Sequence, residues 1–415
     1  MRGSYLVTPC RRWSMPRFCN RLLFVVLVPA LLYTSAFANE LQTPTATIPN
    51  SYFGLHIHHL SYPAPTTPWP SIPVPTWRLW DAVVRWPDLE PNKGQWQFER
   101  LDHYVSLAHE HGTSILLPLG MTPVWAAARP QINAEPKNMD DWRTFVKTVV
   151  SRYKGRIQAY EIWNEPNLSD FWTGTMDQML TLTKEASVII HSLDPQAIVV
   201  SPSATTEYGI PWLEEFLNKG GGRYVDVIGY HFYVSPNLPE NVVPVIRRVR
   251  NVMSGSDSGT KPLWNTEMGW LAPTRFDSEE DAAGFLARAY ILAWAAGVQR
   301  FYWYAWDNRS LAIVTYKEAE HKVAPAGNAY KVMQQWLVGA RMESCFESAD
   351  HSWTCELSRS GKKSWIVWNP RGDLKFDVPA AWQVKSVTPL LEDRRSLDGS
   401  SIDIGPSPTL LTGRS

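Results

Sequence analysis

Short runs of apolar and β-branched residues recur along most of the chain, and helix-like segments separate them. Within each run the apolar character is continuous and does not alternate, which is typical of parallel strands that are buried on both faces. The intervening segments are amphipathic, most clearly at 97–111, 140–153, 176–192 and 278–296. The predicted strands are 52–58, 76–81, 114–119, 157–163, 197–201, 225–231, 262–266 and 299–304.

Alternating strands and helices predict an α/β fold with a parallel sheet that helices cover. Eight strand–helix units are the number that closes a (β/α)8 barrel, or TIM barrel, which usually takes ~250 residues. We therefore predict such a barrel over residues 39–338. The proline-rich stretch 61–75 suits neither a helix nor an inner strand, so we expect an extended loop at the barrel rim.

The sequence changes character after residue 338. Short segments of alternating pattern, such as SWIVWNP (364–370) and LKFDVP (374–379), are separated by turn signals. This pattern predicts a small C-terminal β-sandwich domain over residues 339–415.

Residues 1–38 have the pattern of a targeting segment. Five arginines and no acidic residue precede the apolar run LLFVVLVPALLY, and AFA at 36–38 supplies the small residues that a signal peptidase accepts. We expect cleavage after Ala38, a secreted or periplasmic protein, and no integral membrane span after cleavage. A retained N-terminal anchor is the alternative, because signal peptides and anchors resemble each other.

Composition narrows the choice of partner. Loss of the five arginines leaves 35 basic against 40 acidic residues, a formal net charge of −5, which argues against nucleic acid. The 21 tryptophans exceed what core filling alone explains. Flat aromatic faces bind the apolar faces of sugar rings, although many of these side chains are expected to be buried.

Cysteine usage agrees with export. Cys10 and Cys19 lie in the targeting segment, which leaves Cys345 and Cys355 in CFESADHSWTC. Two cysteines that flank a short turn-rich segment in a secreted protein predict a disulfide that closes a β-hairpin. Their spacing matches no zinc motif.

Two glutamates follow barrel strands. Glu165 ends the fourth strand, and Pro166 both stops the strand and biases Glu165 away from the helical backbone region. Glu267 comes just after the seventh strand. Because the carboxyl ends of barrel strands share one face, the two carboxylates should lie across one mouth, as hydrolysis of a glycosidic bond requires. The alternative is that they only cap the following helices.

Three motifs in order, WNEPN (163–167), YHFY (230–233) and NTEMGW (265–270), resemble glycoside hydrolase clan A, the retaining (β/α)8 enzymes. Within the clan the chain looks most like family 39 and its bacterial relatives, including hydrolases encoded with exopolysaccharide operons. The resemblance implies that Glu165 is the acid/base and Glu267 the nucleophile. It also implies that Asn164 holds the sugar 2-hydroxyl, since an amide both donates and accepts.

The same resemblance assigns three supporting residues. His231 and Tyr233 match the sixth-strand His-x-Tyr, with Tyr233 expected to donate a hydrogen bond to Glu267 and keep it ionised. Arg78 matches the second-strand arginine that neutralises the nucleophile. A structural salt bridge from Arg78 to Asp81 or to another barrel carboxylate is the alternative.

Aromatic residues near the strand ends are candidates for sugar contacts. Trp125 follows the third strand, and Trp303 and Trp306 lie around the end of the eighth, where a sugar platform would be built. Each of the three is as well suited to the core.

Histidines at the first strand invite two interpretations. His56 and His58 share one strand face, and His59 is next to them. We expect His56 to donate hydrogen bonds to sugar hydroxyls and predict no metal, because the cluster lacks a convincing third ligand.

The sequence thus predicts a secreted, cofactor-free retaining glycoside hydrolase that cleaves β-glycosidic bonds in a polysaccharide or oligosaccharide by double displacement. Glu267 is expected to have a low pKa and Glu165 a high one. The alternatives are an exo-acting β-xylosidase-type enzyme and a non-catalytic carbohydrate-binding barrel.

Overall fold

The computed structural model describes residues 40–60, 67–270, 276–308, 311 and 313–413, and these described residues belong to one compact unit. The predicted targeting segment and part of the predicted rim loop, residues 61–66, lie outside the described residues. Among the residues described, no helix is both long and apolar enough to cross a bilayer.

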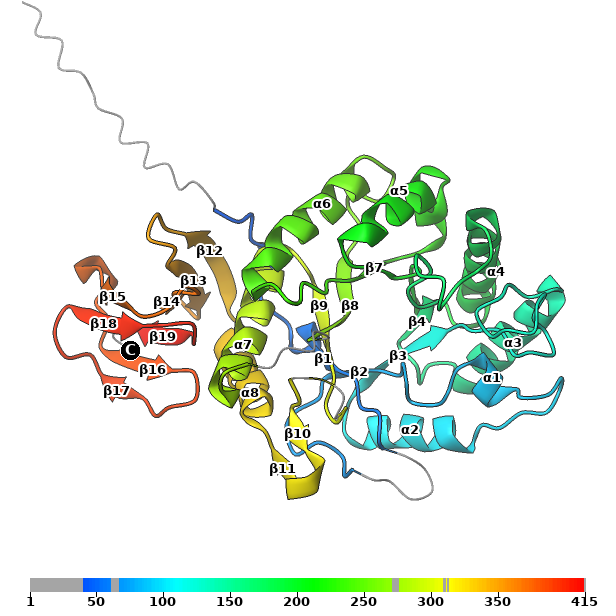
Figure 1. Cartoon of the computed structure of the whole chain (residues 1–415), viewed down its shortest axis with the longest axis horizontal. Helices are drawn as coiled ribbons and strands as arrows, with labels where there is room; N and C mark the ends of the chain where they lie inside the picture. Colours follow the sequence, from blue (N-terminus) through cyan, green and yellow to red (C-terminus); the bar gives the residue numbers. More distant parts are fainter. Residues whose placement is uncertain (1–39, 61–66, 271–275, 309–310, 312, 414–415) are drawn as a thin grey trace, which may run out of the picture. The chain divides into compact units, whose positions relative to one another are not determined.

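A parallel sheet forms the centre of the larger part (Figure 1). Its order is β5-β4-β3-β2-β1-β9-β8-β7-β6, and neighbouring strands run parallel throughout. The strands are β1 (Phe53–Leu55), β2 (Thr76–Arg78), β3 (Ser114–Leu119), β4 (Ala159–Ile162), β5 (Ile198–Val200), β6 (Ala204–Thr205), β7 (Ile228–His231), β8 (Leu263–Gly269) and β9 (Arg300–Tyr304).

The two ends of this sheet meet. β5 and β6 are consecutive pieces of one barrel strand, because Val200 bridges Val227 next to β7 while Ser203 bridges Asn164 after β4. The sheet therefore closes into a barrel of eight strand positions, and each predicted strand overlaps one of them. The predicted fold class is confirmed.

Helices surround the barrel, and their amphipathic patterns explain why (Figure 1). Side-chain caps start several of them: Asn138 accepts from Asp140 N, and Thr175 forms a capping box with Gln178. The helices are α1 (Trp86–Leu89), α2 (Glu99–Glu110), α3 (Met139–Tyr153), α4 (Met176–Leu193), α5 (Ile210–Asn218), α6 (Val242–Ser254), α7 (Glu279–Ala295) and α8 (Pro325–Leu337).

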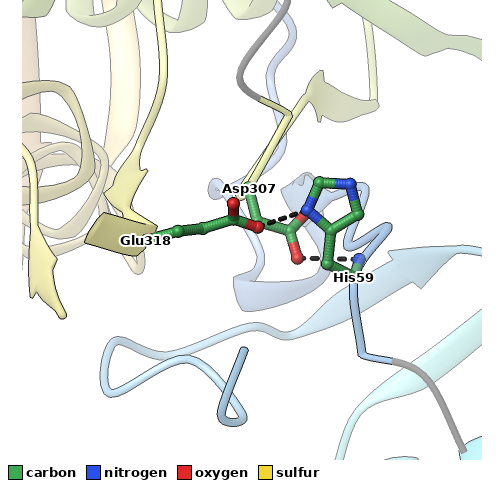
Figure 2. Close-up of side chains that lie close together, drawn as sticks. All are labelled: His59, Asp307 and Glu318. Carbon is green, nitrogen blue, oxygen red and sulfur yellow. Dashed lines mark hydrogen bonds and ion pairs between the residues drawn. The ribbon is translucent and has the colours of Figure 1, made fainter. Parts of the chain in front are cut away.

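Two loops at the barrel rim are tied together (Figure 2). The Asp307 carboxylate, just after β9, accepts from the backbone amides of His58 and His59 at 2.8 and 2.9 Å and from the Thr67 hydroxyl at 2.9 Å. His59 Nδ1 also pairs with the carboxylate of Glu318, which follows the hairpin strand β10 (Tyr316–Lys317) and precedes its partner β11 (Lys322–Val323). These contacts hold the segment after β1 against the segment after β9.

A second β-rich part follows α8 and has two antiparallel sheets. Apolar side chains from both sheets, including Trp365, Val387 and Ile404, meet in a core between them, as in a β-sandwich. One sheet has the order β12-β13-β14-β19-β16-β17 and the other pairs β15 with β18. The strands are β12 (Arg341–Glu347), β13 (Trp353–Arg359), β14 (Lys362–Trp368), β15 (Leu374–Asp377), β16 (Ser386–Pro389), β17 (Arg395–Ser396), β18 (Ser401–Ile404) and β19 (Thr409–Thr412).

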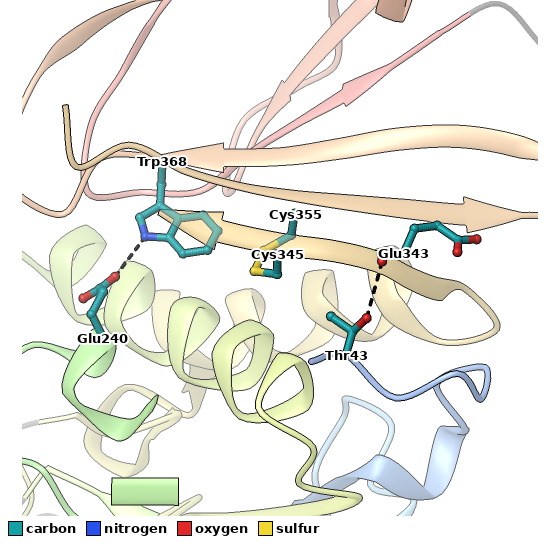
Figure 3. The surroundings of a disulfide bond; sticks show 6 residues. All are labelled: Thr43, Glu240, Glu343, Cys345, Cys355 and Trp368. Carbon is teal, nitrogen blue, oxygen red and sulfur yellow. Dashed lines mark hydrogen bonds between the residues drawn. A yellow bond between two sulfur atoms is a disulfide. The ribbon is translucent and has the colours of Figure 1, made fainter. Parts of the chain in front are cut away.

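The sandwich packs directly on the barrel helices. Met342, Trp353 and Trp368 are buried in the same apolar cluster as α7, and Trp368 Nε1 donates to Glu240 at 2.9 Å (Figure 3). This packing explains why α7 is buried on nearly all sides. α8 ends at Leu337 and β12 begins at Arg341, while the domain limits at 38 and 338 stay a prediction.

The structure contains the predicted disulfide. Cys345 and Cys355 lie directly opposite each other in the antiparallel β12–β13 pair, and both are fully buried on the face of this sheet that packs against the helices (Figure 3). The bond closes a hairpin, as the sequence predicts.

Replacement of Cys345 and Cys355 together by alanine should lower the free energy of unfolding by about 2–3 kcal/mol. A cross-link between residues 10 positions apart restricts the unfolded chain. Guanidinium unfolding of the oxidised wild type, the reduced wild type and the double variant measures the effect. The reduced wild type should lose stability as the variant does, and equal stability of all three would contradict the cross-link.

Candidate active site

Glu165 stands on an unusual backbone at the end of β4. Trp163 and Glu165 have φ values of 70° and 44°, in the left-handed region that non-glycine residues rarely adopt. The Glu165 amide donates to Ser203 O at 2.9 Å, which holds this turn against the neighbouring barrel strand. Backbone strain of this kind collects at functional sites. Pro166 does keep Glu165 out of the right-handed helical region, but the residue becomes left-handed instead of extended.

Glu267 lies inside β8 and not after it, which corrects the predicted strand end at 266. The register shifts on both sides of this strand, between Tyr230 and His231 in β7 and between Asn265 and Met268 in β8. An irregularity of this type is a β-bulge, which re-aims side chains next to active sites. The bulge lets β8 continue to Gly269 while Glu267 faces the barrel mouth.

The two glutamates converge at the mouth. Carboxylate oxygens of Glu165 and Glu267 and a ring nitrogen of His231 all lie within 4.8 Å of one another. Glu165 is 9% and Glu267 7% exposed, so both carboxylates are nearly out of contact with solvent. The helix-capping alternative fails for this pair, because the side chains meet each other across the barrel.

Arg78, at the end of β2, connects three barrel strands. Its guanidinium donates to Glu161 at 2.6 Å, to Glu267 Oε2 at 2.7 Å and to Asn164 Oδ1 at 2.7 Å. Arg78 is wholly buried. The predicted contact with the nucleophile and the alternative of a barrel salt bridge are therefore both present, with Glu161 and not Asp81 as the second carboxylate.

His231 and Tyr233 each contact one glutamate. Tyr233 donates to Glu267 Oε1 at 2.8 Å, which is the hydrogen bond that the sequence predicts. His231 Nδ1 lies 2.8 Å from Glu165 Oε1. Burial lowers the pKa of His231 to about 4, so its ring is neutral at neutral pH.

Burial raises the pKa of both glutamates. For Glu267 it raises the pKa to about 7, although His231 and Arg78 act in the opposite direction. The predicted low pKa of Glu267 is therefore wrong, and the reason is that Arg78 shares its charge with Glu161 while desolvation acts on Glu267 in full. Burial also raises the pKa of Glu165, as predicted.

The tryptophan predictions separate into two groups. Trp303 and Trp306 are 0% exposed: Trp303 packs edge-on against Phe285 of α7, and Trp306 stacks on Tyr316. Neither offers a face to a sugar, so the predicted platform is wrong at these two positions. Trp125 is partly exposed on the segment after β3, where its Nε1 donates to Glu90 O at 2.9 Å.

Tyr304, and not Trp303, is the aromatic residue of β9 that lies at the barrel mouth. It is the last residue of β9, is only partly buried, and donates from its hydroxyl to Asp81 Oδ2 at 2.6 Å. Side chains alternate along a strand, so Tyr304 shares a face with Tyr302, which lies in the barrel interior. Counting every second residue along β9, from the interior residue Tyr302 toward the mouth, would have selected Tyr304.

His56 lies beneath Tyr304. Its Nε2 contacts Thr266 O at 3.1 Å, and its ring centroid lies 5.0 Å from that of Tyr304, while the ring of His58 lies 4.7 Å from it. His56 is fully buried, and burial lowers its pKa well below the usual value. In this structure His56 therefore contacts the barrel backbone next to the mouth, and its predicted hydrogen bond to a sugar hydroxyl stays a prediction.

Two groups of three potential ligands could hold a metal ion in the described part of the chain. One is the catalytic candidate group itself, and the other is His59, Asp307 and Glu318. In the second group Asp307 already accepts three hydrogen bonds that fix the rim loops, and Figure 2 shows the one from His59. The absence of a metal and of a cofactor stays a prediction.

Comparisons with known proteins match the part of the chain that contains the two glutamates. The family model described as "Glycosyl hydrolases family 39" matches residues 80–269, a range that includes both glutamates. Among curated proteins, the chain is 35% identical over 106 residues to a β-xylosidase of Caldicellulosiruptor saccharolyticus, covering 24% of this chain and 22% of that protein. It is 37% identical over 182 residues to endo-1,4-β-xylanase 3 of Hypocrea jecorina, covering 43% of this chain and 49% of that protein. The chain thus spans less than half of these relatives.

Solved structures share the fold. A family 39 glycoside hydrolase from Bacteroides cellulosilyticus WH2 superposes with a TM-score of 0.68 at 18% identity, over 82% of this chain and 76% of that one. A family 39 β-xylosidase from Caulobacter crescentus gives 0.63 at 17% identity, over 89% and 98%. The chain thus resembles family 39 glycoside hydrolases over residues 80–269 and shares the fold of these solved structures.

Proposed function

We propose that the protein is a retaining O-glycosyl hydrolase that cleaves β-glycosidic bonds in a polysaccharide or oligosaccharide by double displacement. The observation that carries the proposal is the approach of Glu165 and Glu267 to within 4.8 Å. Retaining glycosidases place their two carboxyl groups about 5–5.5 Å apart, whereas inverting enzymes leave about 6.5–9.5 Å for a water molecule. The approach of the nearest carboxylate oxygens fits the shorter, retaining spacing.

Glu267 is the nucleophile of the proposed reaction. Arg78 donates to one of its oxygens and Tyr233 to the other, so the carboxylate is held in one orientation. A nucleophile that does not have to reorganise attacks the anomeric carbon from a fixed position. The bond from carbon to the departing oxygen breaks as the ester to Glu267 forms, with inversion at that carbon.

Glu165 is the acid and then the base. Burial raises its pKa, which favours the protonated acid, and this proton goes to the departing oxygen. Formation of the ester removes the charge of Glu267, so the pKa of Glu165 then falls. Glu165 can now accept a proton from water, whose oxygen attacks the anomeric carbon and restores the original configuration.

Further residues are proposed to bind the sugar. The Asn164 side chain is oriented by Arg78 through its oxygen, which directs its NH2 group to donate to a 2-hydroxyl. Trp125 is proposed as a more distant contact. Because the matched relatives include β-xylosidases and xylanases, β-xylosides are the first substrates to test. The exo-acting β-xylosidase-type enzyme is the alternative within this class, and a non-catalytic binding barrel is the alternative outside it.

We also propose that residues 1–38 direct export of the protein. Their arginine-rich start, apolar run and AFA sequence support this proposal. N-terminal sequencing of protein from the periplasm and medium should give Asn39 as the first residue, and an intact N-terminus in the membrane fraction would favour the anchor.

Replacement of either glutamate by alanine should impair different steps. With dinitrophenyl β-xyloside, which needs no acid to depart, Glu165→Ala should release one equivalent of dinitrophenol in a burst and then stall at the ester. Glu267→Ala should show no burst, and azide should restore turnover and give a glycosyl azide of inverted configuration. Burst kinetics and product analysis measure both, and identical behaviour of the two variants would contradict the assigned roles.

The pH dependence of kcat/KM should be a bell shifted above the ordinary carboxyl range. In the proposed roles the rate rises with pH as Glu267 ionises and falls as Glu165 loses its proton, and burial raises the pKa of both carboxyls, that of Glu267 to about 7. Tyr233→Phe removes a donor from the Glu267 carboxylate, so the acidic limb should move up by about 1–2 pH units while the basic limb stays nearly in place. A shift of the basic limb alone would mean that Tyr233 acts on Glu165.

A further inference from the structure

Asp81 and Tyr304 form a pair at the barrel mouth that the proposed mechanism does not use. Asp81 follows β2 and Tyr304 ends β9, and the hydroxyl of Tyr304 donates to Asp81 Oδ2 at 2.6 Å. β1 lies between these two strands in the sheet. The pair therefore spans the end of β1, and Tyr304 rests on the rings of His56 and His58 below it.

Asp81 is exposed, unlike the other carboxylates of the site. Among the described residues its carboxylate accepts one hydrogen bond, from Tyr304, and forms no salt bridge, so Oδ1 is open to a ligand. Its backbone is left-handed, with φ 58°, a conformation that aspartate and asparagine adopt more readily than most residues. Burial and the charge of Asp81 raise the pKa of Tyr304, so its hydroxyl stays protonated and a donor.

The pair lies beside the reacting groups. The negative charge of Asp81 contributes to the raised pKa values of both Glu165 and Glu267, and the charge of Glu267 contributes to that of Tyr304. The geometry agrees, because Arg78, three residues before Asp81, donates to Glu267, and Tyr304 pairs in register with Gly269, two residues after Glu267. A sugar placed over Glu267 would thus meet the exposed carboxylate of Asp81 and the edge of Tyr304.

We propose that Asp81, fixed by Tyr304, accepts hydrogen bonds from hydroxyls of the sugar whose bond is cleaved and makes the enzyme select neutral sugars over uronic acids. This inference rests on the proposed glycosidase activity and adds its substrate class. A carboxylate is a strong acceptor for sugar hydroxyls. It repels the carboxylate of a uronic acid at the same place, and repulsion of this kind is a common source of specificity.

The test compares 4-nitrophenyl β-xyloside, β-glucoside and β-glucuronide as substrates of the full-length wild type and of Asp81→Asn. Asparagine tolerates the left-handed backbone, so the loop should keep its shape. For the best neutral glycoside, kcat/KM should fall about 10- to 100-fold, because one hydrogen bond to a charged group is weakened. The ratio of neutral to glucuronide kcat/KM should fall by at least tenfold, and both limbs of the pH profile should move to lower pH as a neighbouring negative charge is lost.

Two further variants serve as controls. Tyr304→Phe keeps the charge of Asp81 and should keep the discrimination against glucuronide, even if its rate falls. Asp177→Asn removes an exposed carboxylate on α4 that pairs with Lys219 and should behave as wild type. An Asp81→Asn enzyme with an unchanged ratio would overturn the inference and leave the proposed function intact. A wild type without activity on any glycoside or polysaccharide would overturn the proposed function first.

Discussion

The buried guanidinium of Arg78 is the interaction on which the site depends. It joins Glu161 on β4, Asn164 after β4 and Glu267 on β8, and thereby fixes the relative positions of strands on opposite sides of the barrel. Removal of its positive charge would leave two buried carboxylates unpaired, which is far more costly than the loss of an exposed ion pair. The nucleophile is therefore held by the same contact that the barrel interior needs for its own stability.

Local departures from regular geometry complete the arrangement. A regular β4 and a regular β8 would place alternate residues inward, and nothing in that alternation alone brings two glutamates within 4.8 Å. The left-handed backbone at Trp163 and Glu165 and the bulge before Met268 turn both carboxylates to the mouth. The barrel strands hold the backbone in place, and these few irregular residues direct the two carboxylates toward the mouth.

The sequence predicted much of this structure because its main signals are local. All eight barrel strand positions, the hairpin with Cys345 and Cys355 and the contact of Tyr233 with Glu267 follow from periodicity, turn residues and motif resemblance. The predictions that were wrong depend on pairing between segments that are distant in the sequence. The face of β9 that turns inward is set by its register with β1 and β8, which decides for Tyr304 against Trp303.

The pKa of Glu267 was missed for a similar reason. Its value depends on the depth of burial and on the second carboxylate, Glu161, that shares Arg78. Glu161 lies within a run of mainly apolar residues, so the sequence alone does not tell which way its side chain faces. The closed barrel shows that it points inward. Charges in a barrel interior therefore have to be counted together, across strands, before a protonation state is assigned.

The stereochemistry of the first product tests the central claim most directly. Proton NMR during hydrolysis of a β-xyloside or of another β-glycoside that the enzyme cleaves separates the two anomers before they interconvert. Double displacement between carboxylates this close predicts that the β-anomer forms first and the α-anomer appears later, by mutarotation. Initial formation of the α-anomer would require water between Glu165 and Glu267 and would contradict the account.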